Sequence, residues 1–133
     1  MKSLTLNGFK EWMDTYGKAC EDSDPKAAAE LFTQNAEYYE TPFAEPMIGQ
    51  DAIYRYWNGA SQALKDVQFS YEILAVKENL GIAPWQGKFV SVKSGNHVAL
   101  DGVFLVEFDE REKCSVFREW WHRQEIDASP NAP

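Results

Sequence analysis

The spacing of the apolar residues changes near the middle of the chain, and this change limits the fold more than any other feature of the sequence. Up to about residue 64, apolar side chains recur every three or four positions, as on one face of an α-helix. Beyond that point they recur at every second position, as on one face of a β-strand. The first half therefore predicts helices, and the second half predicts an antiparallel sheet.

Three helices and one strand are predicted in the first half. The first helix carries an apolar stripe made of Phe9, Trp12, Met13, Tyr16 and Cys20. Asp24 before Pro25 is typical of a helix cap followed by proline at the first helical position, which predicts a second helix over 27–32. A strand is predicted over 36–40, and two prolines indicate a loop over 41–46.

The third helix begins at Gly49-Gln50-Asp51, and four strands follow it. The apolar stripe of this helix is made of Ile53, Tyr56, Trp57, Ala60 and Leu64. The four strands are predicted over 67–75, 85–92, 97–108 and 114–125. Polar turns at 93–96 and 109–112 join the last three strands into a meander.

The strand over 97–108 shows which face of the sheet is buried. One of its faces is apolar throughout, with Val98, Leu100, Gly102, Phe104, Val106 and Phe108. We expect this face to be concave and covered by all three helices. The other face is half apolar, and with the helices on the concave side a second subunit is the natural partner for it. We therefore predict a homodimer through the outer sheet face.

Composition limits the function. The 133 residues suffice for one domain, which we place at 1–125, with a flexible tail over 126–133. The net charge of −8 disfavours nucleic acid or an anionic membrane as partner. The N-terminus shows no apolar run typical of a signal peptide, and two distant cysteines, Cys20 and Cys114, indicate reduced thiols in a cytoplasmic protein. Five Trp, six Tyr and eight Phe are first of all typical of a well-packed core, and their excess also suggests an aromatic-lined cavity.

Four segments together carry a resemblance to a known superfamily. They are the 24–32 helix, the Ala36-Glu37-Tyr38-Tyr39-Glu40 strand, the 49–53 helix start and the closing Glu119-Trp120-Trp121. In this order and spacing, residues 5–125 resemble the nuclear transport factor 2-like superfamily, and more narrowly its SnoaL-like and ketosteroid-isomerase-like members. The resemblance implies an α+β cone, a cone-shaped barrel in which a curved sheet wraps three N-terminal helices in the order ααβαββββ.

The resemblance to the ketosteroid isomerases also implies candidate catalytic positions. In those enzymes a carboxylate at the end of the first strand moves a proton, and a tyrosine and a protonated aspartic acid hydrogen-bond the oxyanion. Here the carboxylate position falls on Glu40 and the tyrosine position on Tyr16. A pocket tryptophan matches Trp121. The aspartic acid position falls on Phe104, which cannot donate a hydrogen bond, so steroid isomerase activity is not expected.

Two registers remain open from the sequence. A shift of one residue near the prolines would replace Glu40 by Thr41 at the carboxylate position. In the last strand, Glu119 faces inward together with Phe117 and Trp121, or Trp120 and His122 face inward instead. Inward, Glu119 is either an acid/base partner of Glu40 or one half of a salt bridge within the sheet.

The leading hypothesis is a pocket for a small, mostly apolar molecule that carries oxygen. Its walls are expected to include Trp12, Trp57, Trp85, Phe104, Phe117 and Trp121. Glu40, Tyr16 and Glu119 are the candidate catalytic residues for acid/base chemistry without a cofactor, of the isomerase, cyclase, dehydratase or hydrolase type. No sequence motif for a metal site is present. The alternative is a non-catalytic binding or association module, which the phenylalanine at position 104 favours.

Overall fold

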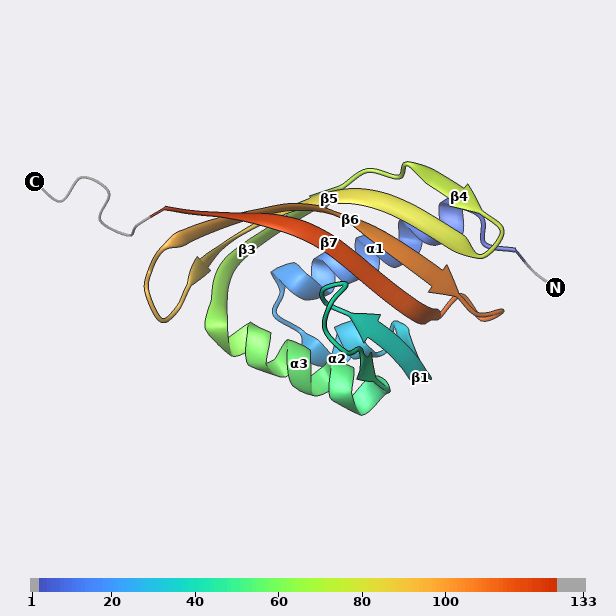
Figure 1. Cartoon of the computed structure of the whole chain (residues 1–133), viewed down its shortest axis with the longest axis horizontal. Helices are drawn as coiled ribbons and strands as arrows, with labels where there is room; N and C mark the ends of the chain where they lie inside the picture. Colours follow the sequence, from blue (N-terminus) through green and yellow to red (C-terminus); the bar gives the residue numbers. More distant parts are fainter. Residues whose placement is uncertain (1–2, 127–133) are drawn as a thin grey trace, which may run out of the picture.

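The chain folds into three helices that pack on one side of a curved, seven-stranded sheet, as the computed structural model of residues 3–126 shows (Figure 1). Helix α1 spans Leu6–Glu21, α2 spans Pro25–Ala29 and α3 spans Gln50–Ala63. The Thr5 hydroxyl accepts the Gly8 N–H at 2.9 Å and so caps α1. This α+β arrangement is the one that the sequence predicts.

Helix α2 is shorter than predicted, and the first strand begins earlier. The prediction of a helix over 27–32 was wrong at its end, because α2 stops at Ala29 and Phe32 already opens β1. The carbonyl of Leu31 accepts hydrogen bonds from the Cys114 amide at 2.9 Å and from the Trp12 indole at 3.1 Å. These distant donors hold the backbone beside the sheet and end the helix, which a local pattern cannot reveal.

Seven strands make up the sheet in these residues. They are β1 Phe32–Tyr39, β2 Met47–Ile48, β3 Leu64–Tyr71, β4 Ala75–Lys77, β5 Leu80–Ser91, β6 His97–Phe108 and β7 Cys114–Ile126. Their spatial order is β2-β1-β7-β6-β5-β3, and β4 pairs with β5 beside β3. The short strands β2 and β4 are additions to the predicted order, since two or three residues show no readable alternation.

The sheet is mixed and open. Every neighbouring pair is antiparallel except β1 and β7, which run parallel with Tyr38 opposite Phe117. Strand β2 forms one edge, and β3 and β4, both paired with β5, form the other, so the sheet does not close into a full barrel. The parallel pairing brings the first strand beside the last one, and it therefore joins the two halves of the chain in one sheet.

Strand β5 starts at Leu80 rather than at residue 85, even though Pro84 lies within it. Proline has no N–H to donate, which normally keeps it out of inner strands. The carbonyl of Pro84 accepts the Glu72 amide at 2.9 Å, on the side where the chain passes from β3 to β4. The proline thus lies at a break in the neighbouring pairing, and the strand continues through it.

The inward face of β6 is the one predicted. Val98, Phe104, Val106 and Phe108 are buried, and the last three belong to the core cluster that includes side chains of α1. On the opposite face His97 and Asp101 are exposed, whereas Val103 and Leu105 are half-buried. The concave side of the sheet therefore faces the core and the helices.

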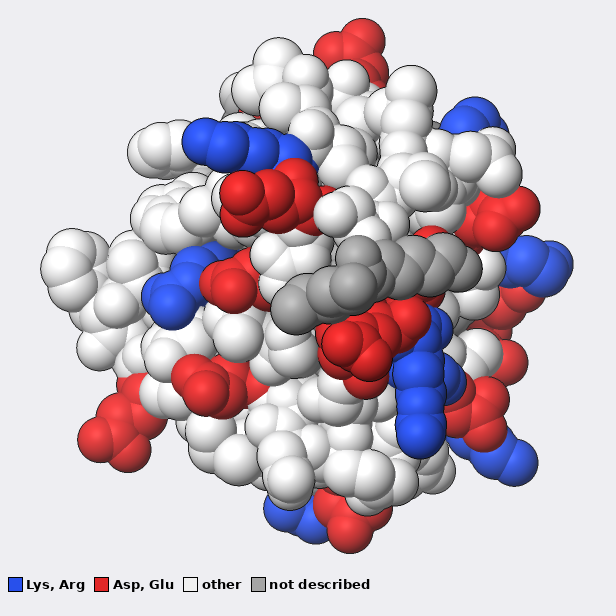
Figure 2. Space-filling model, turned by 90° about the vertical axis from the view of Figure 1, so that its right-hand side faces the viewer, with Lys and Arg blue, Asp and Glu red and all other residues white. Residues whose placement is uncertain are grey.

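Two further observations concern the surface and the C-terminus. Within residues 3–126, no helix combines the length and apolarity needed to cross a bilayer. On the face in Figure 2, Lys and Arg side chains are interspersed with Asp and Glu rather than gathered into one basic patch. Ile126, the first residue of the predicted tail, is instead the last residue of β7, and the rest of that tail (127–133) lies outside the described residues.

Candidate functional site

A cavity of about 220 Å³ lies between the helices and the concave face of the sheet. Its wall is mainly aromatic, with Tyr16, Tyr38, Tyr56, Trp57, Phe69, Trp85, Phe89, Phe104 and Trp121. Two glutamates, Glu40 and Glu119, lie among these rings. Small side chains on the helices, Ala19 and Ala60, leave the space open. An apolar wall with a few convergent polar groups is typical of a small-molecule site.

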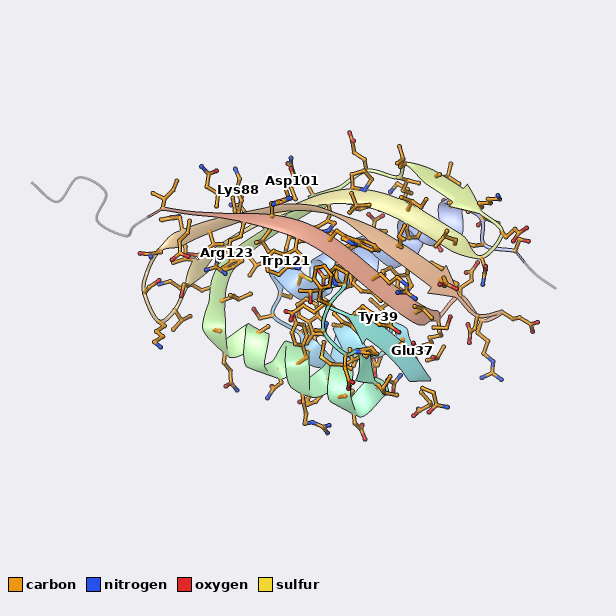
Figure 3. All side chains as sticks on the ribbon, viewed as in Figure 1. Glu37, Tyr39, Lys88, Asp101, Trp121 and Arg123 are labelled. Carbon is orange, nitrogen blue, oxygen red and sulfur yellow. The ribbon has the colours of Figure 1, made fainter. Side chains whose placement is uncertain are left out.

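The cavity has a buried end and an exposed mouth. Tyr16, Tyr38 and Phe104 are buried at the inner end, whereas Gln68 and Arg123 are exposed at the mouth. Figure 3 shows Trp121 and Arg123 on the side of the sheet that faces the helices, and Asp101 on the opposite side. Arg123 pairs with Glu125 at 2.7 Å, and neither Arg123 nor Lys88 of the wall forms a salt bridge with Glu40 or Glu119.

Glu119 belongs to the inward face of β7. It lies opposite Phe104 of β6 and shares its face with Phe117 and Trp121, so the register with Glu119 inward is the one present. Only 7% of its surface is exposed. The Tyr38 hydroxyl donates a 2.8 Å hydrogen bond to Oε2 of Glu119. The alternative of a salt bridge to Arg123 is not present, because that guanidinium pairs with Glu125.

The environment of Glu119 favours its protonated form. Burial raises the pKa of its carboxyl group to about 8, the Tyr38 hydrogen bond opposes this rise, and the charge of Glu40 adds to it. A carboxyl group with this pKa is mostly protonated at pH 7 and can donate a proton or a hydrogen bond.

Glu40 follows directly after β1 and is half-buried on the cavity wall. The Tyr56 hydroxyl donates a 2.5 Å hydrogen bond to Oε2 of Glu40. The Trp121 indole donates to the backbone carbonyl of Glu40 at 3.1 Å. The residue at the cavity is thus Glu40, and Thr41 is not part of the wall. Two contacts from α3 and β7 hold this carboxylate and its backbone in place.

Tyr16 faces the cavity from α1 but does not hydrogen-bond Glu40. It is 2% exposed, and its ring stacks on those of Trp12 and Phe117, with centroids 5.4 and 5.6 Å away. Burial raises the pKa of its hydroxyl well above the ordinary value, with smaller raising effects from Cys20 and Glu119. Tyr16 therefore stays neutral and can act as a hydrogen-bond donor.

Trp12 and Phe117 were predicted as pocket walls, but the structure places them in the core behind the cavity. Phe117 stacks on Tyr38 at a centroid distance of 4.7 Å, and Trp12 stacks on Tyr16. The two tyrosines thus occupy the wall, and Trp12 and Phe117 support them from behind. Sequence parity identifies which residues point inward, but it cannot tell which of them are covered by another ring.

The other four predicted wall residues, Trp57, Trp85, Phe104 and Trp121, do line the cavity. The indole N–H groups of Trp57 and Trp85 are buried and have no hydrogen-bond partner among the described residues. A buried donor without a partner costs about 1–3 kcal/mol.

The histidines and cysteines lie outside the proposed chemistry. His97 and His122 are exposed on the outer face, as is Trp120, which is 41% exposed. Cys20 and Cys114 are free, and burial raises the pKa of Cys20 to about 12, so its thiol stays protonated. In residues 3–126, no group of three or more His, Cys, Asp and Glu residues is arranged to hold a metal ion.

Sequence reasoning missed the roles of Tyr38 and Tyr56. Both carried a usable signal, since Tyr38 shares the inward parity of Ala36 and Tyr56 lies on the apolar stripe of α3. The signal indicates that each side chain points inward. It does not indicate that each hydroxyl meets a carboxyl group, because the partners come from elements far apart in the chain.

Comparison with solved structures shows the same fold in two proteins. One is the epoxide hydrolase/cyclase-like enzyme SalBIII, described with pyran ring formation in the polyether salinomycin, with a TM-score of 0.76 and 19% identity. The match covers 85% of this chain and 89% of that one. The other is a Bacillus subtilis protein described as a candidate isomerase, with a TM-score of 0.77 and 20% identity, over 88% of this chain and 90% of that one.

Sequence comparison gives the family. A search of curated proteins found no significant match. The family model of the SnoaL-like domain matches residues 10–116, which include α2, α3, β1 and most of the sheet. Together with the cone fold, this match shows that the chain belongs to the SnoaL-like family within the nuclear transport factor 2-like superfamily.

Proposed function

We propose that the protein is an enzyme that carries out acid/base chemistry on a small, mostly apolar molecule that bears oxygen, without a cofactor. The observation that carries this proposal is the presence of two glutamates in one aromatic cavity in different environments. Glu119 is buried and has its pKa raised to about 8, whereas Glu40 is half-buried and its charge contributes to that rise. Two carboxyl groups in unlike environments are what a general acid and a general base require.

The roles follow from these environments. Glu119 donates its proton to an oxygen of the bound molecule, as a C–O bond breaks or a carbonyl becomes an enol. Glu40 accepts a proton from a neighbouring C–H, from a hydroxyl group or from water, so that the two transfers balance. Tyr16 donates a hydrogen bond to the same oxygen or a second one. The aromatic wall excludes water and so strengthens these interactions.

Isomerisation, cyclisation, dehydration and epoxide opening all fit this pair of transfers. The structural neighbours include an epoxide hydrolase/cyclase-like enzyme and a candidate isomerase, which supports the same range. The cavity of about 220 Å³ lies below the usual range of roughly 300–1,000 Å³ for ligand pockets, which favours a small molecule.

The test is turnover of two substrate classes by three proteins. Small apolar epoxides, with and without a hydroxyl group, and unsaturated ketones are incubated with wild type, Glu119→Gln and Glu40→Gln, and the products are separated by chromatography. We expect turnover by wild type and a loss of roughly 100- to 10,000-fold in each variant. Binding of the same compounds, followed by tryptophan fluorescence, should persist in both variants.

Glu37→Gln is the matched control, since it makes the same chemical change on the outer side of β1. It should keep wild-type turnover. Full activity of Glu119→Gln or Glu40→Gln would overturn the assigned role. Binding by wild type without conversion of either class would instead support a non-catalytic binding module.

Self-association through the outer sheet face remains a prediction. The Arg118 guanidinium stacks on the Tyr39 ring at 4.4 Å, and Trp120 is 41% exposed nearby on β7. A large exposed aromatic side chain of this kind is more common at interfaces than on free surfaces. Analytical ultracentrifugation of wild type and Trp120→Glu is expected to show a dimer for the first and a monomer for the second.

A further inference from the structure

We infer that Tyr38 is a positioning residue for the proposed reaction, because its hydroxyl holds one carboxyl oxygen of Glu119 and leaves the other, proton-bearing oxygen facing the cavity. This inference rests on the proposed function, in which Glu119 is the acid. It adds a residue that neither the sequence nor the family comparison assigns.

The pairing of the first and last strands creates this contact. In the parallel ladder, Tyr38 of β1 lies opposite Phe117 of β7, and Glu119 is the next inward residue along β7. The Tyr38 ring stacks on Phe117 with a centroid distance of 4.7 Å and is 1% exposed. Because the ring is clamped, its hydroxyl group is held 2.8 Å from Oε2 of Glu119.

The hydrogen bond distinguishes the two oxygens of Glu119. Oε2 accepts a hydrogen bond from the Tyr38 hydroxyl. Oε1 has no hydrogen-bond partner among the described residues and is accessible from the cavity. A protonated carboxyl group has one O–H oxygen and one acceptor oxygen. Since Tyr38 donates to Oε2, the proton of Glu119 resides on Oε1, where a bound molecule can reach it.

The groups around Glu119 leave Tyr38 as its one direct partner. Tyr16 and Cys20 of α1, Tyr56 of α3 and Glu40 interact with it electrostatically, and Phe104 faces it from β6. Further along its own strand, Arg123 pairs with Glu125. Burial and Glu40 raise the pKa of Glu119, and the Tyr38 hydrogen bond is the one contact that lowers it.

Glu40 has its own tyrosine. The Tyr56 hydroxyl donates to Glu40 at 2.5 Å, and the rings of Tyr38 and Tyr56 lie 5.5 Å apart. Each carboxyl group is therefore oriented by a separate hydroxyl group. Removing the Tyr38 hydroxyl should change Glu119 while the contact of Glu40 remains.

The experiment is a carbon-13 NMR titration of the glutamate side-chain carboxyl groups in the free protein. Wild type, Tyr38→Phe and the control Tyr39→Phe are compared, and the Glu119 signal is assigned by its loss in Glu119→Gln. Tyr39 is the next residue of β1, and its hydroxyl bonds Glu37 on the outer side. We expect Tyr38→Phe to shift the Glu119 titration upward by about one pKa unit and Tyr39→Phe to leave it unchanged.

A second variant tests the same hydrogen bond if Tyr38→Phe does not fold. Site-specific replacement of Tyr38 by 3-fluorotyrosine keeps the shape and makes the hydroxyl a stronger donor, so the Glu119 titration should shift downward. A Glu119 signal that titrates near pH 8 in every protein would overturn the role of Tyr38 alone. A Glu119 signal that titrates near its ordinary value of 4.5 in wild type would overturn the acid role itself.

Discussion

Glu119 on β7 and Glu40 after β1 line one cavity, and the charge of Glu40 contributes to the raised pKa of Glu119. The two residues are far apart in the sequence and line the same cavity because β1 and β7 pair in parallel. Each accepts a hydrogen bond from a different tyrosine. In the function proposed above, Glu119 is the proton donor and Glu40 is the proton acceptor.

Replacing Glu119 should change how stability depends on pH. The pKa of Glu119 rises from about 4.5 to about 8 on folding, so between these values the folded state holds a proton that the unfolded state has lost. Stability from this group is present below pH 4.5 and falls by about 1.4 kcal/mol per pH unit as pH rises toward 8. Glu119→Gln should remove this slope.

Urea unfolding of wild type and Glu119→Gln at several pH values from 5 to 8 measures that difference. The variant should gain stability relative to wild type as pH rises. Glu110→Gln, in an exposed turn, serves as control and should follow the wild-type curve. A constant difference between wild type and Glu119→Gln across this range would contradict the raised pKa.

Filling the cavity should abolish ligand binding without unfolding the protein. Ala60 of α3 lines the cavity, and Ala60→Leu adds a larger apolar side chain that can occupy the empty space. Ala63→Leu makes the same change at an exposed position at the end of the same helix. We expect the first variant to lose at least 10-fold in affinity for cavity ligands and the second to bind normally.

Isothermal titration with a compound that wild type converts or binds gives the affinities, and thermal unfolding gives the stabilities. Both variants should melt within a few degrees of wild type. Unchanged affinity in Ala60→Leu would show that ligands bind elsewhere.

Replacing Gly102 or Gly59 by alanine should change the stability of the protein in opposite directions. A Cβ atom on Gly102 would lie 2.0 Å from the Trp120 carbonyl oxygen, across the β6–β7 ladder. The backbone cannot yield there without breaking the ladder, so Gly102→Ala should destabilise the protein by more than about 2 kcal/mol. Gly59 in α3 has no atom within 4 Å of such a Cβ, so Gly59→Ala should stabilise it by about 0.5–1 kcal/mol.

Chemical denaturation of the two variants beside wild type checks both signs. A mild effect of Gly102→Ala would mean that the two strands are further apart at this point than the structure shows.

Apart from that of the exposed Trp120, the tryptophan indole protons should fall into two groups in the free protein. The indoles of Trp12 and Trp121 each donate to a backbone carbonyl at 3.1 Å, whereas those of Trp57 and Trp85 have no partner among the described residues. A hydrogen bond moves an N–H proton downfield. We therefore expect the Trp12 and Trp121 signals downfield of the other two in a nitrogen-15 correlation spectrum.

Single Trp→Phe variants assign these signals. Coincident signals for Trp12, Trp57, Trp85 and Trp121 would contradict this difference in pairing.

Much of the fold can be predicted from local patterns. The helical spacing of Trp12 and Tyr16 identifies the first helix and its buried face. The alternation of apolar residues around Phe104 does the same for β6. The ends of the elements are harder to predict from the sequence, as the early end of α2 and the passage of β5 through Pro84 show. Both depend on hydrogen bonds to distant residues, namely Cys114 and Glu72.

The candidate site divides in the same way. Glu40, Tyr16 and Glu119 could be named from the resemblance and from strand parity, and all three line the cavity. Trp12 and Phe117 could be identified as inward but not as covered, because coverage depends on Tyr16 and Tyr38 stacking over them.

The sequence by itself determined the segregation of helices and strands, the inward face of each, the family and the residue types available at the pocket. These properties follow from side-chain spacing along a single element. Only the tertiary structure decided that β1 runs parallel to β7, that Tyr38 meets Glu119 and that Tyr56 meets Glu40. Such contacts join residues that are far apart in the sequence. The burial that raises the pKa of Glu119 likewise depends on how distant elements pack together.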